Sequence, residues 1–264
     1  MKITTKATYL SSVAALFAVA TASAETTGNR YGYPVLYHSD ISAARAWVDV
    51  DSRKKITLSN NRKLKPVIID VRRVEEFVKG HPPGAISIPF PHVSGSPKQA
   101  NDNTNGYIGY DISVDPEVGF LAAEGKDGTL PISDFVNYVL SLYPDKDTPI
   151  YLLCATGHRS VQAANALAKY GSFTQVRNIW EGYNGQPKYA YTGSLPTNKI
   201  VDGKAQFVQL DLNNDDKFDD NDKDGWAYYQ GLPTTNKLVR KDLARPFFDL
   251  YAQSVQAETG SPSK

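Results

Sequence analysis

The chain has 264 residues, of which 41% are hydrophobic and 22% charged, a composition typical of globular proteins. Its formal net charge is +1. Because basic and acidic residues are interspersed, we expect no binding surface for nucleic acid or for anionic lipid.

The first 24 residues have the features of a secretory signal peptide. Lys2 and Lys6 precede an apolar run over 9–20, and Ala22-Ser23-Ala24 supplies the small residues after which signal peptidase cleaves. The apolar run is shorter than the roughly 20 residues that a membrane-spanning helix needs. We therefore expect a periplasmic or secreted protein without a membrane anchor, whose mature chain starts near Glu25.

Short apolar strands and helical patterns alternate along the chain. The run VIIDV over 67–71 is typical of a parallel strand that is covered on both faces. This alternation predicts an α/β fold with a parallel sheet flanked by helices and with active residues at the carboxyl ends of the strands. The predicted strands cover 67–71, 85–88, 150–153 and 176–179, and the predicted helices cover 74–79, 135–143 and 160–170.

The expected domain covers 35–240 and contains two irregular insertions. The first insertion, 92–130, is rich in Gly, Asn, Asp, Pro and Tyr and lacks clear periodicity. The second covers 186–224, and a C-terminal tail of residues 241–264 follows the domain.

The only cysteine of the chain, Cys154, lies between a predicted strand and a predicted helix. Cysteines in an oxidising compartment usually pair as disulfides, so this single thiol is either buried and inert or reactive. Backbone amides in a tight loop with a glycine can surround an anion, and the helix dipole adds positive potential. Arg159 and a protonated His158 would add charge that favours a thiolate. The loop consists of Cys154, Ala155, Thr156, Gly157, His158, Arg159 and Ser160.

Two segments in the correct order resemble the motifs of the rhodanese family. Residues 67–90, VIIDVRRVEEFVKGHPPGAISIPF, resemble its upstream signature, and residues 149–171, PIYLLCATGHRSVQAANALAKYG, resemble its active-site strand, loop and helix. Residues 176–182, Gly225-Trp226 and Gly231-Leu232-Pro233 are similar to later elements of the family. The resemblance covers about residues 40 to 235.

The resemblance implies a sulfurtransferase that works without a catalytic cofactor. Cys154 would take the sulfane sulfur of a small anionic donor such as thiosulfate and pass it from a persulfide to cyanide or a thiol. Arg159 would bind the sulfonate of the donor, and Asp70 and Arg72 would hold the loop by hydrogen bonds. The remaining loop residues, Ala155, Thr156, Gly157, His158 and Ser160, would bind the donor. The sequence identifies no partner protein.

Two other functions stay open at this point. A non-catalytic module could use the same loop to bind sulfur or an anion, while its insertions bind a partner protein. A cysteine phosphatase is the second alternative, but related phosphatases have a Cys-x5-Arg loop, whereas Arg159 follows Cys154 in a Cys-x4-Arg loop.

An acidic segment in the second insertion resembles an EF-hand-type calcium loop. Oxygen-bearing side chains occupy loop positions 1, 3, 5, 9 and 12, and position 7 would contribute a backbone carbonyl. Position 6 is Asp216 rather than Gly, and position 12 is an Asp rather than a Glu. We expect a structural calcium ion here, with a solvated acidic loop as the alternative. The predicted ligands are Asp211, Asn213, Asp215, Lys217, Asp219 and Asp222.

Overall fold

The computed structural model describes residues 31, 33–51, 55–90, 131–191 and 207–260. The predicted signal peptide and the first insertion lie outside the described residues, as does part of the second insertion. Within the described ranges, no helix has the length and apolar character to cross a membrane.

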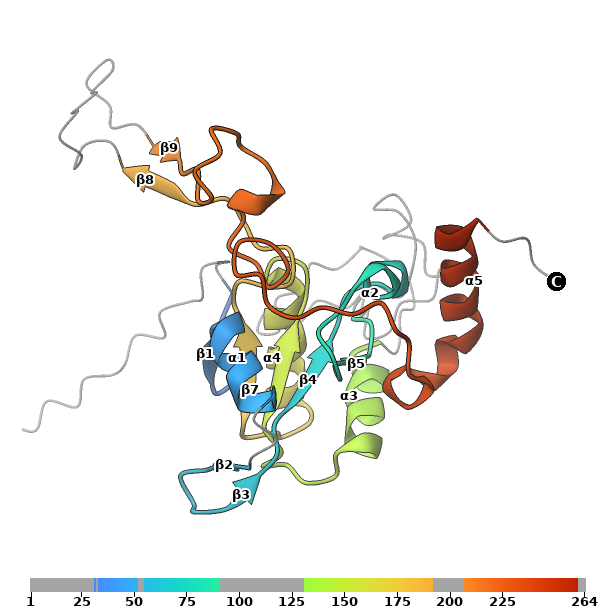
Figure 1. The fold of residues 1–264 in the computed structure, drawn as a ribbon. Coiled ribbons are helices and arrows are strands. Elements are labelled where there is room, and N and C mark those ends of the chain that lie inside the picture. Colours follow the sequence, from blue (N-terminus) through green and yellow to red (C-terminus); the bar gives the residue numbers. More distant parts are fainter. Residues whose placement is uncertain (1–30, 32, 52–54, 91–130, 192–206, 261–264) are drawn as a thin grey trace, which may run out of the picture.

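A five-stranded parallel sheet forms the centre of the molecule (Figure 1). Along the sheet the strands follow the order β1 (Ser39–Ile41), β7 (Val176–Ile179), β6 (Ile150–Leu153), β4 (Val67–Asp70) and β5 (Ile86–Ser87). The register pairs Val67 with Ile150 and Asp70 with Leu153, so β4 and β6 end at the same edge. The predicted parallel α/β architecture is therefore confirmed.

Helices cover both faces of the sheet, with α1 (Ala43–Asp51) and α4 (His158–Lys169) on opposite sides (Figure 1). Successive residues of a strand point to opposite faces. All four residues of β6 are buried, which shows that neither face of this strand is open to water. Two further helices, α2 (Val74–Lys79) and α3 (Pro131–Leu142), follow β4 and precede β6.

Several described elements were not predicted from the sequence. Among them are β1, α1, and the short hairpin of β2 (Ile56–Thr57) and β3 (Lys63–Leu64). Helix α4 begins at His158, two residues before the predicted start. As a consequence, His158, Arg159 and Ser160 form the first turn of this helix.

The second insertion begins and ends at adjacent points of the chain. Gln186 N–H donates to Asp224 Oδ1 over 2.8 Å, and Asp224 N–H donates to Gln186 O over 3.2 Å. Between these ends, β8 (Tyr189–Tyr191) and β9 (Phe207–Gln209) form an antiparallel hairpin that projects away from the central sheet (Figure 1). The acidic loop follows β9 and ends in a 3₁₀ turn over Asp220–Asp222.

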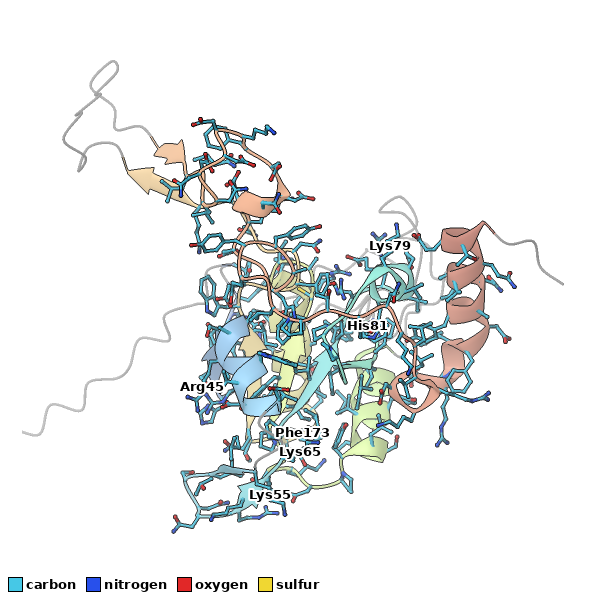
Figure 2. The ribbon with its side chains drawn as sticks, viewed as in Figure 1. Arg45, Lys55, Lys65, Lys79, His81 and Phe173 are labelled. Atoms are coloured by element: carbon cyan, nitrogen blue, oxygen red, sulfur yellow. The ribbon has the colours of Figure 1, made fainter. Side chains whose placement is uncertain are left out.

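The C-terminal residues pack against the domain. Two 3₁₀ turns, Arg240–Asp242 and Arg245–Phe247, lead into α5 (Phe248–Thr259). Tyr251 is 2% exposed and its hydroxyl lies 2.7 Å from Ser87 Oγ. Lys79 at the end of α2 faces α5, where its Nζ lies 3.3 Å from Glu258 Oε1 (Figure 2). The segment expected to be a tail therefore includes a helix that helps to cover the core.

Candidate active site

Cys154 directly follows β6 and lies at the carboxyl edge of the sheet. The turn after it depends on Gly157, whose φ of 93° lies in the left-handed region that residues with a Cβ disfavour. A Cβ at this position would also lie 2.4 Å from the backbone oxygen of Trp180. In this conformation Gly157 N–H donates a hydrogen bond to Cys154 Sγ over 3.2 Å. The glycine thus allows the loop to direct a backbone donor at the sulfur.

The sulfur also faces the first turn of α4. Ser160 Oγ lies 3.4 Å from Cys154 Sγ, 3.0 Å from Gly157 O and 2.7 Å from Asn178 Oδ1. The backbone N–H groups in the first turn of a helix have no acceptor within the helix and form the positive end of its dipole. This arrangement favours negative charge on a sulfur at the start of α4.

The turn that follows β7 holds the cysteine loop through backbone hydrogen bonds. Tyr183 N–H donates to Cys154 O over 2.7 Å, and Asn184 N–H donates to Ala155 O over 2.8 Å. Cys154 is only 1% exposed. The sulfur is therefore recessed in a loop whose backbone is fixed by hydrogen bonds from another part of the chain.

Arg159 is paired with a carboxylate from α2. Its Nη1 and Nη2 lie 2.9 and 3.0 Å from the two carboxylate oxygens of Glu76. Burial alone would raise the pKa of Glu76, but the hydrogen bond and charge of Arg159, with the charge of Arg72, lower it to about 2. Burial would likewise lower the pKa of Arg159, but its pairing with Glu76 raises it. The resemblance implies that Arg159 binds the sulfonate of the donor. In the structure this guanidinium is already paired with the carboxylate of Glu76.

His158 lies between two tyrosines at the outer side of the loop. Its Nε2 is 2.8 Å from Tyr33 Oη, and its ring makes an edge contact with Tyr31 at 5.5 Å between centroids. Partial burial of the ring and the charge of Arg159 lower the pKa of His158 below 6.5. This shift disfavours the protonated form in which His158 was expected to add positive charge beside the sulfur.

Tyr31 also contacts the loop backbone. Its hydroxyl donates to Thr156 O and lies 3.3 Å from Trp180 O. Together, Tyr31, Tyr33 and His158 form an aromatic rim beside the cysteine loop. The sequence around Tyr31 and Tyr33 indicates no role for these side chains.

Asp70 and Arg72 support the site by packing and not by hydrogen bonds to the loop. Arg72 Nη2 donates to Asp70 Oδ2 over 2.7 Å and to Gly80 O over 2.6 Å. Both side chains are buried, and the Arg72 guanidinium lies 3.8 Å from the centroid of the Tyr183 ring. Because the Tyr183 backbone holds Cys154 O, this buried pair supports the loop through Tyr183.

The predicted calcium ligands direct their oxygens to backbone amides of their own loop. Asp211 accepts from Asp216 N–H over 2.7 Å, and Asp222 accepts from Leu212 N–H and Asp219 N–H over 2.7 and 3.0 Å. Asp216, at loop position 6, adopts the left-handed conformation with φ of 60°. In the described part of the chain no three His, Cys, Asp or Glu side chains come together as a metal site. Calcium binding therefore stays a prediction for solution experiments. The other predicted ligands, Asn213, Asp215, Lys217 and Asp219, lie in the same exposed segment.

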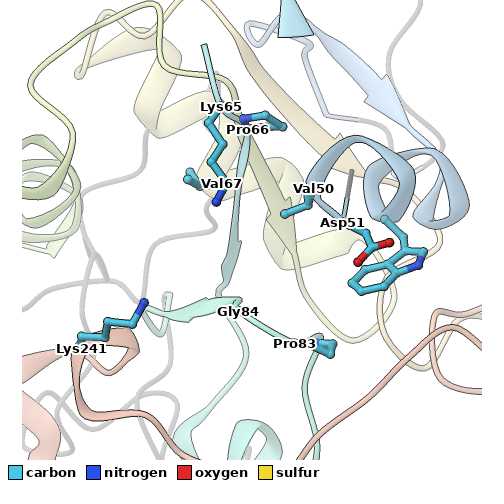
Figure 3. A pocket seen from close by; sticks show the side chains of 9 residues that line it. Val50, Asp51, Lys65, Pro66, Val67, Pro83, Gly84 and Lys241 are labelled. Atoms are coloured by element: carbon cyan, nitrogen blue, oxygen red, sulfur yellow. The ribbon is translucent and has the colours of Figure 1, made fainter. Parts of the chain in front are cut away.

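A pocket of about 310 Å³ lies beside the start of β4 (Figure 3). It is lined by the residues before and at the start of β4, including Lys65 and Val67, and by Lys241. Val67 begins β4, whereas Cys154 follows the end of the parallel strand β6. None of the predicted site residues lines this pocket.

The rhodanese-like domain family matches residues 55–186, which is half of the chain and includes both motifs. The chain belongs to the rhodanese-like domain family. The family assignment agrees with the parallel sheet and with the position of Cys154 at the end of β6. A comparison with curated proteins finds no match.

Three solved structures are similar to this rhodanese-like chain at low identity. Thiosulfate sulfurtransferase from Pseudomonas aeruginosa shares 20% identity, covering 67% of this chain and 22% of that one, with a TM-score of 0.33. Rv0390 from M. tuberculosis shares 16% identity over 76% of this chain and 99% of that one, with a TM-score of 0.38. The rhodanese-like domain of the Alr3790 protein from Anabaena sp. shares 22% identity over 44% and 55%, with a TM-score of 0.25.

Proposed function

We propose that this protein transfers sulfane sulfur through a persulfide on Cys154. The Cys154 thiolate attacks the outer sulfur of a donor, the S–S bond of the donor breaks, and the donor leaves with the bonding electron pair. A thiolate or cyanide then attacks the outer sulfur of the Cys154 persulfide and releases the Cys154 thiolate. No net oxidation or reduction occurs, so the cycle requires no redox cofactor.

The observation that carries this proposal is the hydrogen bond from Gly157 N–H to Cys154 Sγ at the start of α4. A thiolate or a persulfide anion at this point gains a backbone donor and the positive end of a helix dipole. Sulfur transfer needs stabilised anionic sulfur and no general base. The pairing of Arg159 with Glu76 counts against phosphatase chemistry, which requires a guanidinium that is available to a phosphate dianion.

Intact-mass measurement tests the proposal directly. Incubation with a sulfane-sulfur donor is expected to add one sulfur atom to the protein, and cyanide is expected to remove it again. The Cys154→Ser variant serves as the control and is expected to gain no sulfur. Sulfur addition to this variant would place the chemistry elsewhere in the chain.

A non-catalytic binding module is the second candidate, because Cys154 is only 1% exposed. If this candidate is correct, the mass of the protein stays unchanged with every donor. A sulfur that is gained but never passed to cyanide or to a thiol would indicate a carrier.

We also propose that the protein is exported to the periplasm or secreted. The support is the charged start, the apolar run and Ala22-Ser23-Ala24 in the sequence. N-terminal sequencing of the protein from the culture medium or periplasmic fraction is expected to begin near Glu25. A protein that retains Met1 in the cytoplasm would contradict export.

A further inference from the structure

The N-terminal part of the described chain lies along α4 and reaches the cysteine loop. Asn165 Nδ2 donates to Pro34 O over 2.9 Å. Nearer the start of α4, Gln162 Nε2 donates to Tyr33 Oη over 3.2 Å. These contacts follow the helix towards its first turn, so that Tyr31 arrives at the loop that precedes α4.

The hydroxyl of Tyr31 holds one particular peptide group of this loop. It donates to Thr156 O and lies 3.3 Å from Trp180 O. The carbonyl of Thr156 and the N–H of Gly157 belong to the same planar peptide unit, in which they point in opposite directions. That N–H is the group that donates to Cys154 Sγ over 3.2 Å. A contact that fixes the direction of the carbonyl therefore also fixes the N–H on the sulfur.

The same peptide has a second orientation that the chain could adopt. The φ of 93° and ψ of −15° at Gly157 are those of the third residue of a type II turn. A type I turn differs mainly by a rotation of the preceding peptide through about half a turn. In the rotated form the Thr156 carbonyl oxygen would face Cys154 in place of the N–H. The oxygen would repel a thiolate, whereas the N–H stabilises it.

We infer that Tyr31 is a positioning residue for the reaction, because it holds the peptide between Thr156 and Gly157 with its N–H directed at Cys154. The glycine is a second requirement, since a Cβ at this position would collide with the Tyr31 hydroxyl. The inference rests on the proposed function, in which the same N–H stabilises Cys154 both as a thiolate and as a persulfide anion. Tyr31 acts through this peptide, and no step of the transfer uses its hydroxyl as an acid or a base.

The Tyr31→Phe variant tests the inference by removing the hydroxyl and keeping the ring. The pH dependence of Cys154 alkylation by iodoacetamide reports the pKa of the thiol, because the thiolate is the reactive form. We expect the midpoint of this profile to lie about one pH unit higher in the variant than in wild type, because the thiolate loses a fixed donor. A change in access to the sulfur alone would alter the rate of alkylation and leave the midpoint unchanged.

The matched control is Tyr33→Phe, which removes a hydroxyl of the same segment. This hydroxyl contacts His158 and Gln162, and not the Thr156 carbonyl. The control is expected to keep the wild-type midpoint. Nuclear magnetic resonance of the Gly157 amide gives a second readout, in which thiolate formation is expected to shift the amide proton strongly in wild type and weakly in Tyr31→Phe.

Two results would overturn the inference. One is a wild-type midpoint in Tyr31→Phe, and the other is an equal rise in Tyr33→Phe, which would assign the effect to docking of the whole segment. Alkylation needs no sulfur donor, so it is measured independently of turnover. Wild-type protein that gains no sulfur, but whose midpoint still depends on Tyr31, would overturn the sulfur-transfer proposal and leave the hold of Tyr31 on the loop peptide in place.

Discussion

The cysteine loop and the acidic loop were both predicted from short motifs, but different hydrogen bonds hold them in the fold. Backbone segments far apart in sequence hold the cysteine loop, and its Gly157 N–H points at the sulfur. The acidic loop follows the projecting β8–β9 hairpin (Figure 1), and its carboxylates accept hydrogen bonds from backbone amides of the same loop. An anion site made of backbone donors is thus built by the fold itself, whereas the carboxylates of the acidic loop accept hydrogen bonds from amides close to them in sequence.

Removing the buried guanidinium of Arg72, which supports the cysteine loop through Tyr183, gives the largest expected loss of stability. Arg72→Met leaves the fully buried Asp70 without its partner and removes the guanidinium from the Tyr183 ring. We expect the free energy of unfolding to fall by about 3–5 kcal/mol, measured by urea denaturation. Arg62→Met, which breaks an exposed ion pair with Asp147, is the control and is expected to change stability little. Equal effects of the two changes would contradict the supporting role of Arg72.

The shape of the cysteine loop is tested by Gly157→Ala. A Cβ there is disfavoured by the positive φ and would lie 2.4 Å from Trp180 O. Gly84→Ala separates the two causes, because Gly84 has a φ of 77° but no atom within 4 Å of the added Cβ. We expect Gly157→Ala to cost about 2 kcal/mol more than Gly84→Ala and to slow alkylation of Cys154 by iodoacetamide. Similar losses in both variants would show that the loop tolerates the extra atom.

The pair of Glu76 and Arg159 makes stability depend on acid pH. Because the folded-state pKa of Glu76 is lowered to about 2, its contribution is present above the unfolded value of 4.5 and is lost as the pH falls towards 2. After allowance for partial solvent exposure, we expect this contribution to be about 1–2 kcal/mol. Urea denaturation of wild type and Glu76→Gln between these pH values measures the difference. A difference between the two proteins that stays constant with pH would contradict the lowered pKa.

Calcium binding by the acidic loop gives the smallest expected effect. If the ion binds the folded protein only, calcium at ten times its dissociation constant stabilises by about 1.4 kcal/mol. We expect the melting temperature to rise with calcium but not with magnesium, and Asp215→Asn to reduce the rise. An unchanged melting temperature in calcium would identify the segment as a solvated acidic loop.

The sequence predicted best those features that depend on neighbouring residues. The continuous apolar runs identified β4, β6 and β7, and the position of Cys154 after a buried strand identified the loop. The partner of Arg159 could not be predicted, because Glu76 lies 83 residues earlier in the chain and nothing in its local pattern distinguishes it from Glu75.

Other parts were missed because they gain stability from distant contacts. The strand β1 has three residues and pairs with β7, more than a hundred residues later. Tyr31 and Tyr33 reach the cysteine loop from the start of the described chain, where the sequence shows no periodicity. The lowered pKa of His158 comes from the partial burial of its ring and from Arg159, and that burial could not be inferred from the loop sequence alone.

The most direct test of the central claim follows a single sulfur atom through Cys154. Protein loaded with glutathione persulfide is separated from the donor and mixed rapidly with an acceptor thiol, and the Cys154 persulfide is quantified by mass over time. We predict one transferable sulfur per chain, released at least as fast as steady-state turnover. A persulfide that persists while turnover proceeds, or turnover that survives in Cys154→Ser, would contradict the account.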